Sequence, residues 1–381
     1  MGINEESLEL HKKLRGKITL KGKIKIKTTK DLSLLYTPGV AEPCRAIAKG
    51  ADPYELTFKN NTVAIVTDGT RVLGLGDIGP EAALPVMEGK ALIMKEFANI
   101  DAFPICLREK NPDKIVEIVK AIEPVFGAIN LEDISTPKVF DIEERLTNEL
   151  NIPVFHDDQH GTAMVVLAGL INALKITGKK KEEIKLVMNG AGSAGHAIAK
   201  LLLAYGVKDV TVFDKDGAIY SGRPNLELHK AKIAAMTNKS NYIGKLADFE
   251  GANVIISAAA PGALPHEAIT KMREPRIVFA LANPISEISL EESKQLGIAV
   301  FGTGRSDYPN QLNNSVIFPG FLRALLDLRV KKITDKMKIA ASVAVAKLVN
   351  PEELAAGKIV PDTFDKRLVN RIVKGVKKSF D

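Results

Sequence analysis

One stretch near the middle of this 381-residue chain constrains its fold more than any other. An apolar run predicts a buried strand over residues 184–189, and it leads directly into Gly190-Ala191-Gly192-Ser193-Ala194-Gly195 and an apolar helix. The next apolar run, 210–213, ends in Asp214, about 19 residues past the last glycine. The order strand, GxGxxG, helix, strand, acid predicts a Rossmann unit that binds a dinucleotide.

Each part of this motif has an expected role. Glycines let the backbone approach a pyrophosphate at the helix N-terminus, and Asp214 is expected to hydrogen-bond the adenosine ribose. Such an acid disfavours a 2′-phosphate, which favours NAD, but the adjacent Lys215 can offset it, so both NAD and NADP stay open. The alternative is that the glycines serve only tight helix–strand packing. The expected cofactor-binding residues are Gly190, Gly192, Ser193, Ala194, Gly195 and Asp214.

Strands and helices alternate on both sides of this motif. Upstream, we expect short buried strands at 63–70, 102–107, 125–129 and 152–155, with helices at 85–97, 113–121 and 139–150. Downstream, we expect strands at 253–258, 277–281 and 298–301, and helices from Phe318 to the end. This alternation predicts an α/β protein of two domains: an N-terminal domain with a mostly parallel sheet, and a Rossmann-type NAD(P)-binding domain.

The expected boundaries follow from this order of elements. The first domain is assigned to residues 1–158 and the nucleotide domain to 159–314, with part of 315–381 packing back on the first domain. The active site is then expected in the cleft between the two domains.

Two pairs of carboxylates stand at predicted strand ends. Glu132-Asp133 follows one apolar run, and Asp157-Asp158 follows another. Because the carboxyl ends of parallel strands share one edge of a sheet, both pairs are expected at the same edge. An all-oxygen cluster there suits a hard divalent cation, whereas a lone acidic pair is more commonly a loop carboxylate or a helix cap.

Bulk properties narrow the class of protein. The net charge is +7, but the lysines are spread along the chain and aromatic residues make up 5%, which disfavours nucleic-acid binding and suits attraction of small anionic substrates. The two cysteines, Cys44 and Cys106, have no metal-ligand spacing, as expected in a reducing cytoplasm. We expect neither a secretory signal nor a membrane-spanning run.

Beyond these patterns, the chain resembles the malic enzymes, in the shorter bacterial and archaeal form. The resemblance extends from about Leu32 to Leu328. The matching segments are Leu35-Tyr36-Thr37-Pro38-Gly39-Val40, Gly74-Leu75-Gly76-Asp77-Ile78-Gly79, Glu88-Gly89-Lys90, Leu131-Glu132-Asp133, Asp157-Asp158 with Gly161-Thr162-Ala163, Ala282-Asn283-Pro284, Thr303-Gly304-Arg305-Ser306-Asp307, and Asn313-Asn314 with Phe318-Pro319-Gly320.

This resemblance implies a function and partners. The family converts L-malate to pyruvate and CO2 with NAD or NADP and with Mg2+ or Mn2+. Its members are oligomeric, so we expect a homodimer or a higher homo-oligomer. The expected partners are therefore a small-molecule substrate and a second copy of the chain, with no nucleic acid and no membrane.

The resemblance also implies roles for single residues. Glu132, Asp133 and Asp158 match the metal ligands. Asp157 matches the neighbouring catalytic carboxylate, and Tyr36 and Lys90 match the acid and the base. Arg71 matches the arginine that holds a substrate carboxylate, and Asn283 and Asn314 match the asparagines near substrate and nicotinamide. His156 and His160 have no assigned role, and we expect them to support a ligand or cap a helix.

The chemistry sets conditions on Lys90 and Tyr36. A lysine accepts the C2 hydroxyl proton only when it is neutral, so we expect burial and a nearby metal to depress the pKa of Lys90. A phenol at Tyr36 can then protonate the enol. Three alternatives compete: a metal-dependent oxaloacetate decarboxylase that does not oxidise malate, a non-catalytic nucleotide-sensing protein, and a nucleic-acid-binding protein.

Overall fold

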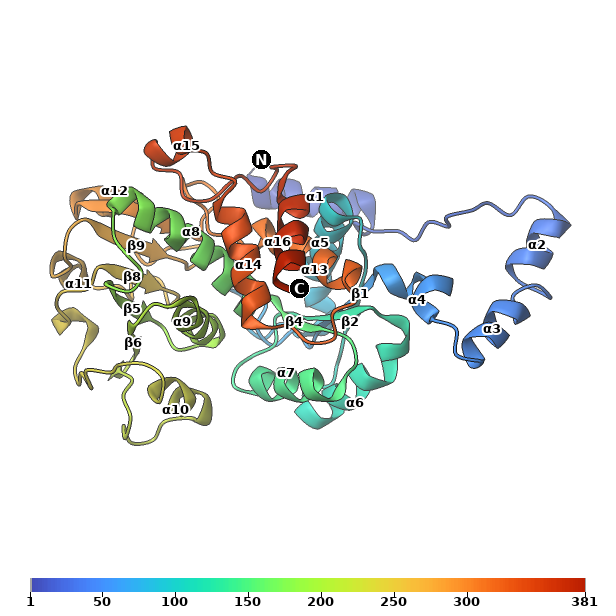
Figure 1. The fold of residues 1–381 in the computed structure, drawn as a ribbon, viewed down its shortest axis with the longest axis horizontal. Coiled ribbons are helices and arrows are strands. Elements are labelled where there is room, and N and C mark those ends of the chain that lie inside the picture. Colours follow the sequence, from blue (N-terminus) through green and yellow to red (C-terminus); the bar gives the residue numbers. More distant parts are fainter. Residues whose placement is uncertain (1, 381) are drawn as a thin grey trace.

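A computed structural model describes residues 2–380 and shows two parallel sheets side by side, with helices packed around each (Figure 1). The first sheet has the strand order β2-β1-β3-β4, and all of its pairings are parallel. Its strands are β1 (Thr62–Thr67), β2 (Asp101–Cys106), β3 (Ala128–Leu131) and β4 (Val154–His156). The predicted two-domain α/β fold is confirmed.

The two faces of the first sheet bury alternate residues, as strand geometry requires. In β1, Val63 and Ile65 belong to the same core as α5 (Gly79–Ala98), whereas Ala64 and Val66 pack with α6 (Pro112–Ile122) and α7 (Lys138–Glu149) on the other face. Every residue of β1 is buried. The sheet is therefore a central layer between helices, and its carboxyl edge is free to present side chains.

The second sheet carries the nucleotide motif. Its order is β10-β9-β8-β5-β6-β7, parallel except for the short β6–β7 pair. The strands are β5 (Lys185–Asn189), β6 (Asp209–Asp214), β7 (Gly217–Ala218), β8 (Val254–Ser257), β9 (Arg276–Ala280) and β10 (Ile298–Thr303). The helices around it are α8 (Thr162–Thr177), α9 (Ser193–Tyr205), α10 (Leu228–Ala234), α11 (His266–Thr270) and α12 (Leu290–Gln295).

The C-terminal helices join the two halves. These helices are α13 (Phe318–Asp327), α14 (Asp335–Ala346), α15 (Pro351–Ala355) and α16 (Leu368–Phe380). Helix α13 contacts α5 and β3, while α14 packs on α8 and α9, and α16 packs on both α13 and α14. The C-terminal segment thus contacts both sheets' helices, and the boundary at residue 158 remains a proposal.

Helix α8 continues a single π-helical turn, Asp157–Gly161. The combined helix, Asp157–Thr177, is long and apolar enough to cross a membrane by length and composition, contrary to our expectation from the sequence. However, 67% of its most apolar window is buried inside the structure. It is accordingly the central helix of the core, packed between α9 and α14.

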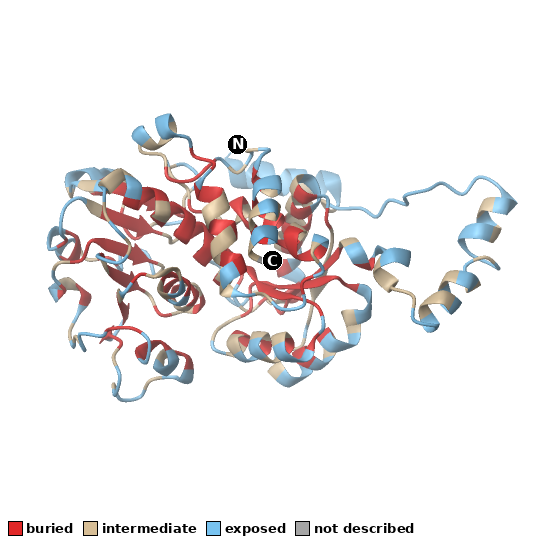
Figure 2. Ribbon diagram, viewed as in Figure 1, coloured by how far each residue is buried: buried red, intermediate tan, exposed pale blue. Residues whose placement is uncertain are grey.

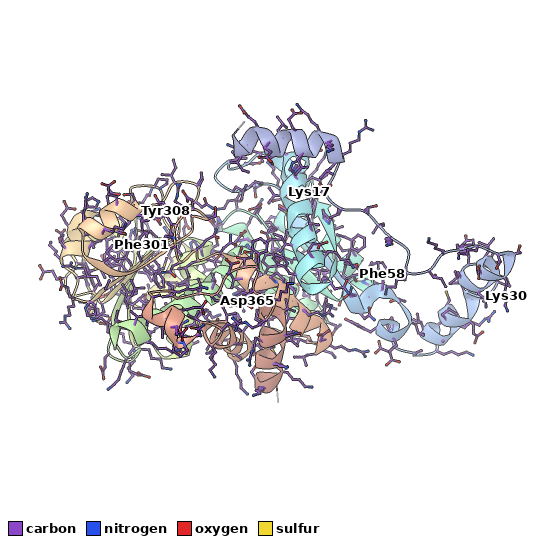
Figure 3. The ribbon with its side chains drawn as sticks, turned by 90° about the horizontal axis from the view of Figure 1, so that it is seen from above. Lys17, Lys30, Phe58, Phe301, Tyr308 and Asp365 are labelled. Carbon is purple, nitrogen blue, oxygen red and sulfur yellow. The ribbon has the colours of Figure 1, made fainter. Side chains whose placement is uncertain are left out.

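An N-terminal arm projects away from the body. It holds α2 (Thr29–Leu35), α3 (Ala41–Ala48) and α4 (Pro53–Leu56), none of which has a buried residue, and it returns to the body at Phe58 (Figures 1 and 3). Burial colouring shows the arm without the buried interior that the rest of the chain has (Figure 2). Helix α1 (Ile3–Leu14), which the sequence did not predict, precedes the arm, and the following Lys17 donates to the Pro85 carbonyl of α5 over 2.6 Å.

Candidate active site

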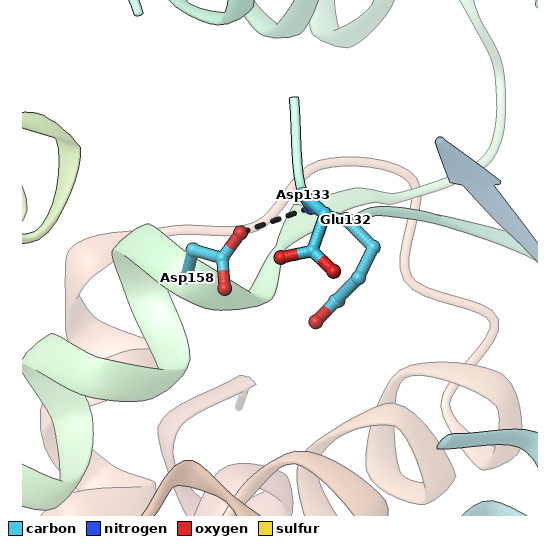
Figure 4. Close-up of side chains that lie close together, drawn as sticks. All are labelled: Glu132, Asp133 and Asp158. Atoms are coloured by element: carbon cyan, nitrogen blue, oxygen red, sulfur yellow. Dashed lines mark hydrogen bonds between the residues drawn. The ribbon is translucent and has the colours of Figure 1, made fainter. Parts of the chain in front are cut away.

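The two acidic pairs meet at the carboxyl edge of the first sheet. Leu131, the last residue of β3, pairs with His156, the last residue of β4, so the carboxylates that follow them are neighbours. Glu132, Asp133 and Asp158 each offer an oxygen, and these oxygens lie within 4.8 Å of one another (Figure 4). The Asp133 backbone N–H also donates to Asp158 Oδ2 over 3.1 Å. The predicted gathering of these three residues is what the structure has.

The donor set fits a divalent cation. All three side chains offer oxygen, the ligand type that Mg2+ and Mn2+ prefer. Asp133 Oδ2 is buried without a hydrogen-bond partner among the described residues. Burial, followed by the charge of Asp158, raises the pKa of Asp133 to about 7. Negative charge is therefore costly here without a cation, and a bound divalent ion would offset that cost.

Lys90 is the nearest cation to this cluster. It is buried in α5, it contacts Glu132 Oε1, and its Nζ lies 2.5 Å from Asp157 Oδ2. Burial lowers the pKa of Lys90, but the attraction of Asp157 and Glu132 outweighs burial, so the pKa is raised above its ordinary value. The protein's own charges therefore raise the pKa of Lys90 instead of lowering it as expected. A cation bound at the carboxylates would weaken this attraction and favour the neutral amine.

Asp157 is held from two sides. Asn314 Nδ2 donates to Asp157 Oδ2 over 2.7 Å, on the same oxygen that Lys90 contacts. The Phe318 ring lies 4.7 Å from Lys90 Nζ and lines the apolar side of the amine. Lys90, Asp157 and Asn314 therefore lie together, as predicted.

Tyr36 does not join this group within one chain. It caps α2 at the far part of the arm, and its side chain is 65% exposed. The structure does hold a cavity of about 610 Å³ beside the amine, lined by Lys90, Asn314 and Phe318, by other residues of α5 and the C-terminal segment, and by His11 and Lys17 near the N-terminus. The position beside Lys90 where a phenol is expected is thus an open, largely apolar cavity.

The glycines of the motif are explained in two different ways: two are required by packing within the protein, and one by the approach of a ligand. A Cβ at Gly190 would lie 2.5 Å from the Ala258 carbonyl oxygen, and one at Gly195 would lie 1.9 Å from the Gly190 oxygen. Those two glycines are required by packing. At Gly192, where φ is −75°, a Cβ would meet no heavy atom of the described chain within 4 Å. Protein packing does not explain Gly192, whereas a cofactor phosphate at the start of α9 does.

Two contacts cross from the first domain to the nucleotide motif. The Arg71 Nη1 donates to Ser193 Oγ over 2.9 Å, at the first residue of α9. A Cβ on Gly74 would lie 3.4 Å from Pro284, so the glycine-rich loop approaches the turn that holds Asn283. The loop that carries Arg71 thus contacts both the start of α9 and the turn that holds Asn283.

Asp214 is engaged by two cations that sequence reasoning missed. Arg223 Nη2 lies 2.9 Å from Oδ1, and Lys230 Nζ lies 3.0 Å from Oδ2. Burial raises the pKa of Asp214, but hydrogen bonds from Lys230 and Arg223 outweigh it and lower the pKa. The predicted partner, Lys215, is exposed instead. No spacing rule marks Arg223 or Lys230, because a turn and a short strand intervene.

The two histidines of the acidic segment lie behind the carboxylates. His156 is fully buried, with its Nε2 3.5 Å from Asp158 Oδ2. His160 Nε2 donates to Glu143 Oε1 over 2.5 Å. His156 thus lies beside one of the proposed ligands, and His160 contacts Glu143, a carboxylate of α7 that no sequence pattern marks.

Comparison with known proteins identifies the family of this chain. Residues 14–147 match the family model "Malic enzyme, N-terminal domain", and residues 159–375 match "Malic enzyme, NAD binding domain". The bifunctional malic/malolactic enzyme of Bacillus subtilis is 53% identical over all of this chain and 93% of its own length. The NAD-dependent malic enzyme of Geobacillus stearothermophilus is 52% identical over 99% of this chain and 78% of its own length.

Solved structures agree with these relatives. The NAD-dependent malic enzyme of Thermotoga maritima superposes with a TM-score of 0.93 at 47% identity, covering 97% of this chain and 98% of the other. The malic enzyme of Pyrococcus horikoshii gives 0.93 at 46% identity, covering 100% and 91%. The matches extend over both domains, and this chain belongs to the malic enzyme family.

Proposed function

We propose that this protein oxidises L-malate with NAD or NADP and decarboxylates the bound product to pyruvate and CO2. The observation that supports this most is Lys90: its amine lies against Asp157 and Glu132, at an acidic cluster that fits Mg2+ or Mn2+. The glycine motif faces the same cleft through Ser193 and Arg71. The relatives are named as NAD- or NADP-dependent malic enzymes.

The chemistry divides among the residues of this chain. Glu132, Asp133 and Asp158 would hold the divalent ion, which when bound polarises the C2 oxygen and stabilises the enolate left after CO2 departs. Lys90, once neutral, would take the proton of the C2 hydroxyl, and the nicotinamide, when bound, would supply the hydride acceptor for C2. Asp157 holds the amine in place through its contact of 2.5 Å.

The remaining substrate contacts follow from charge and position. Arg71 is proposed to bind a malate carboxylate, because a guanidinium binds two oxygens at once. Asn283 and Asn314 would contact substrate and nicotinamide from the turn after β9 and from the segment before α13. The cofactor pyrophosphate would lie against Gly190, Gly192, Ser193, Ala194 and Gly195, with its ribose on Asp214.

We further propose that the protein is at least a homodimer and that Tyr36 acts in the site of a second copy. The arm exposes Leu32, Leu34, Leu35 and Val40 by 44%, 63%, 41% and 39%. An apolar surface of this kind is expected to be covered by a partner. The cavity beside Lys90 is apolar enough for a phenol ring, and none of its lining residues belongs to the chain's own arm. A two-fold pair that exchanges arms would supply each site with Tyr36.

We place the protein in the cytoplasm. Cys44 and Cys106 are both free thiols, and Cys44 is exposed on the arm. Exposed free thiols suit a reducing compartment. Growth of a tagged strain followed by fractionation would check this, and recovery outside the cytoplasm would contradict it.

The proposed activity has a direct test. Reduced-cofactor absorbance should rise on adding malate, Mn2+ and NAD or NADP, with pyruvate as the product. Analysis for lactate should accompany it, since the Bacillus relative is named bifunctional. Lys90→Ala should abolish turnover while cofactor binding survives. Decarboxylation of oxaloacetate without malate-dependent absorbance would favour the decarboxylase alternative, and binding without any turnover would favour a nucleotide sensor.

A further inference from the structure

A chain of polar contacts leads away from the acidic cluster into α7: hydrogen bonds join Glu143, Gln159 and His156, whereas His156 Nε2 approaches Asp158 without a hydrogen bond. The chain begins at Glu143, whose side chain is 15% exposed. Gln159 Nε2 donates to Glu143 Oε2 over 2.7 Å and to His156 Nδ1 over 2.5 Å. His156 Nε2 then faces Asp158 Oδ2 at 3.5 Å. Gln159 and His156 are 2% and 0% exposed, so water does not replace these contacts.

Which atom donates in each hydrogen bond between Glu143, Gln159 and His156 follows from the number of hydrogens on the Gln159 amide. An amide NH2 group has two hydrogens, and both are used by Glu143 and His156. His156 Nδ1 must then accept, which places the imidazole proton on Nε2, the atom that faces Asp158. Because the Glu143 carboxylate only accepts hydrogen bonds, it keeps the nitrogen of the Gln159 amide, rather than the oxygen, directed toward Glu143 and His156.

Glu143 is suited to this task because each of its two oxygens accepts a hydrogen bond from a different side chain. His160 Nε2 donates to the other oxygen, Oε1, over 2.5 Å, and Lys338 Nζ lies 3.4 Å from His160 Nδ1. Burial raises the pKa of Glu143, but the attraction and hydrogen bond of His160 outweigh it and lower the pKa to about 2. Glu143 is therefore an acceptor on both oxygens.

We infer that Glu143 is a positioning residue for the metal site: through Gln159 and His156 it orients Asp158 toward the divalent ion. The inference rests on the proposed function, since it takes Asp158 as a ligand. Groups that orient metal ligands in this way typically contribute roughly tenfold to hundredfold in metal affinity. The π-helical turn Asp157–Gly161 carries both Asp158 and Gln159, so holding Gln159 also fixes the turn.

A merely structural role is the competing explanation. Glu143 belongs to α7, and it lines a cavity of about 1110 Å³ between α7 and helices α9 and α10 of the nucleotide domain. Its contacts could serve only to hold α7 in place. The two explanations differ in what they predict for metal affinity at unchanged stability, and in whether Glu143 and Gln159 act as one unit.

The test measures Mn2+ dissociation constants of the full-length protein by titration with MnCl2, alongside thermal unfolding. Glu143→Gln leaves one acceptor oxygen for two donors, and Gln159→Met removes the link, so each should weaken Mn2+ binding roughly tenfold. Because both substitutions interrupt the same series of contacts, the double variant should lose no more Mn2+ affinity than either single variant does. Glu144→Gln, the adjacent residue that pairs with Lys232 instead, is the matched control and should bind as the parent does.

Each outcome decides the question. Parent-like affinity in Glu143→Gln, or a double variant that multiplies the two single losses, overturns the inference. If Glu143→Gln fails to fold, Gln159→Met decides it, because parent-like Mn2+ affinity in that variant overturns the inference equally. Asp158→Asn distinguishes the metal assignment from the positioning role of Glu143. If Asp158→Asn loses Mn2+ binding and Glu143→Gln does not, only the positioning role is refuted. If Asp158→Asn loses no Mn2+ binding, both the metal assignment and the positioning role are refuted.

Discussion

Arg71 of the first domain hydrogen-bonds Ser193 of the nucleotide domain over 2.9 Å. One side chain, proposed to hold a malate carboxylate, thus rests on the first residue of the helix proposed to receive the cofactor pyrophosphate. The proposed substrate and cofactor sites are therefore adjacent.

Replacing this arginine should separate substrate binding from cofactor binding. Arg71→Lys keeps the charge but loses the two-pronged contact, so kcat/KM for malate should fall roughly tenfold to hundredfold. The dissociation constant of NAD, measured by nucleotide fluorescence, should change far less. A larger loss in cofactor affinity than in malate kcat/KM would assign Arg71 to the pyrophosphate.

Mixing two inactive variants should restore activity if Tyr36 acts in a second copy. Tyr36→Phe and Lys90→Ala should each be inactive alone. After equal mixing and exchange of subunits, half of the dimers are mixed and each has one intact site, so about one quarter of the parent activity should return. Native mass spectrometry should verify that exchange occurred. Verified mixed dimers without activity would place the pair within one chain, whereas an active Tyr36→Phe variant would remove Tyr36 from the reaction.

Two glycines of one motif should respond differently to a methyl group. Gly192→Ala adds a Cβ into open space, so it should weaken cofactor binding and leave the unfolding temperature near that of the parent. Gly195→Ala places a Cβ 1.9 Å from the Gly190 oxygen and should destabilise the fold by about 1–3 kcal/mol. Calorimetry and cofactor titration measure both effects. Unaltered cofactor affinity in Gly192→Ala would mean that no ligand approaches that position.

Arg223 and Lys230, the cations beside Asp214, should allow the protein to use NADP as well as NAD. Lys230 lies 3.0 Å from the carboxylate that would otherwise repel a 2′-phosphate. Lys230→Ala should therefore lower kcat/KM with NADP roughly tenfold and leave kcat/KM with NAD less affected. Lys215→Ala, at the exposed residue next to Asp214, is the control and should change neither kcat/KM with NAD nor kcat/KM with NADP. An equal loss with both cofactors would show that Lys230 only supports the fold.

His196 should make the fold acid-sensitive. Burial, followed by the nearby charges of His229 and Lys200, lowers its pKa from 6.5 to about 4. Between these values the unfolded chain binds more protons, so stability is present above about pH 6.5 and is lost as pH falls toward 4. His196→Gln should remove at most about 3 kcal/mol of that loss.

Chemical denaturation at pH 7 and pH 4 checks this. His266→Gln, at a half-exposed imidazole on α11, is the control and should follow the parent. If His196→Gln and the parent lose the same stability between the two pH values, then His196 is not the source of the acid sensitivity.

The sequence predicted the sheets well and the site unevenly. Strand ends at Glu132 and Asp158 could be placed together, because parallel strands share an edge and the apolar runs were clear. Lys90 could not be chosen from its pattern, since a lysine within a helix is usually solvated; only the family resemblance selected it.

Other features depended on tertiary structure. The apolar residues of the arm gave no sign of their exposure, because an apolar run does not reveal whether a partner or the chain's own core covers it. Arg223 and Lys230 reach Asp214 across a turn, and Glu143 reaches Gln159 from another helix. Such contacts have no fixed sequence spacing, so periodicity and motifs cannot reveal them.

The most direct test of the metal assignment is an anomalous difference map from crystals grown with MnCl2. The account predicts one strong peak bonded to an oxygen from each of Glu132, Asp133 and Asp158, at distances of about 2.2 Å. A map with no peak among these three carboxylates, or with the ion bound elsewhere in the cleft, would contradict it.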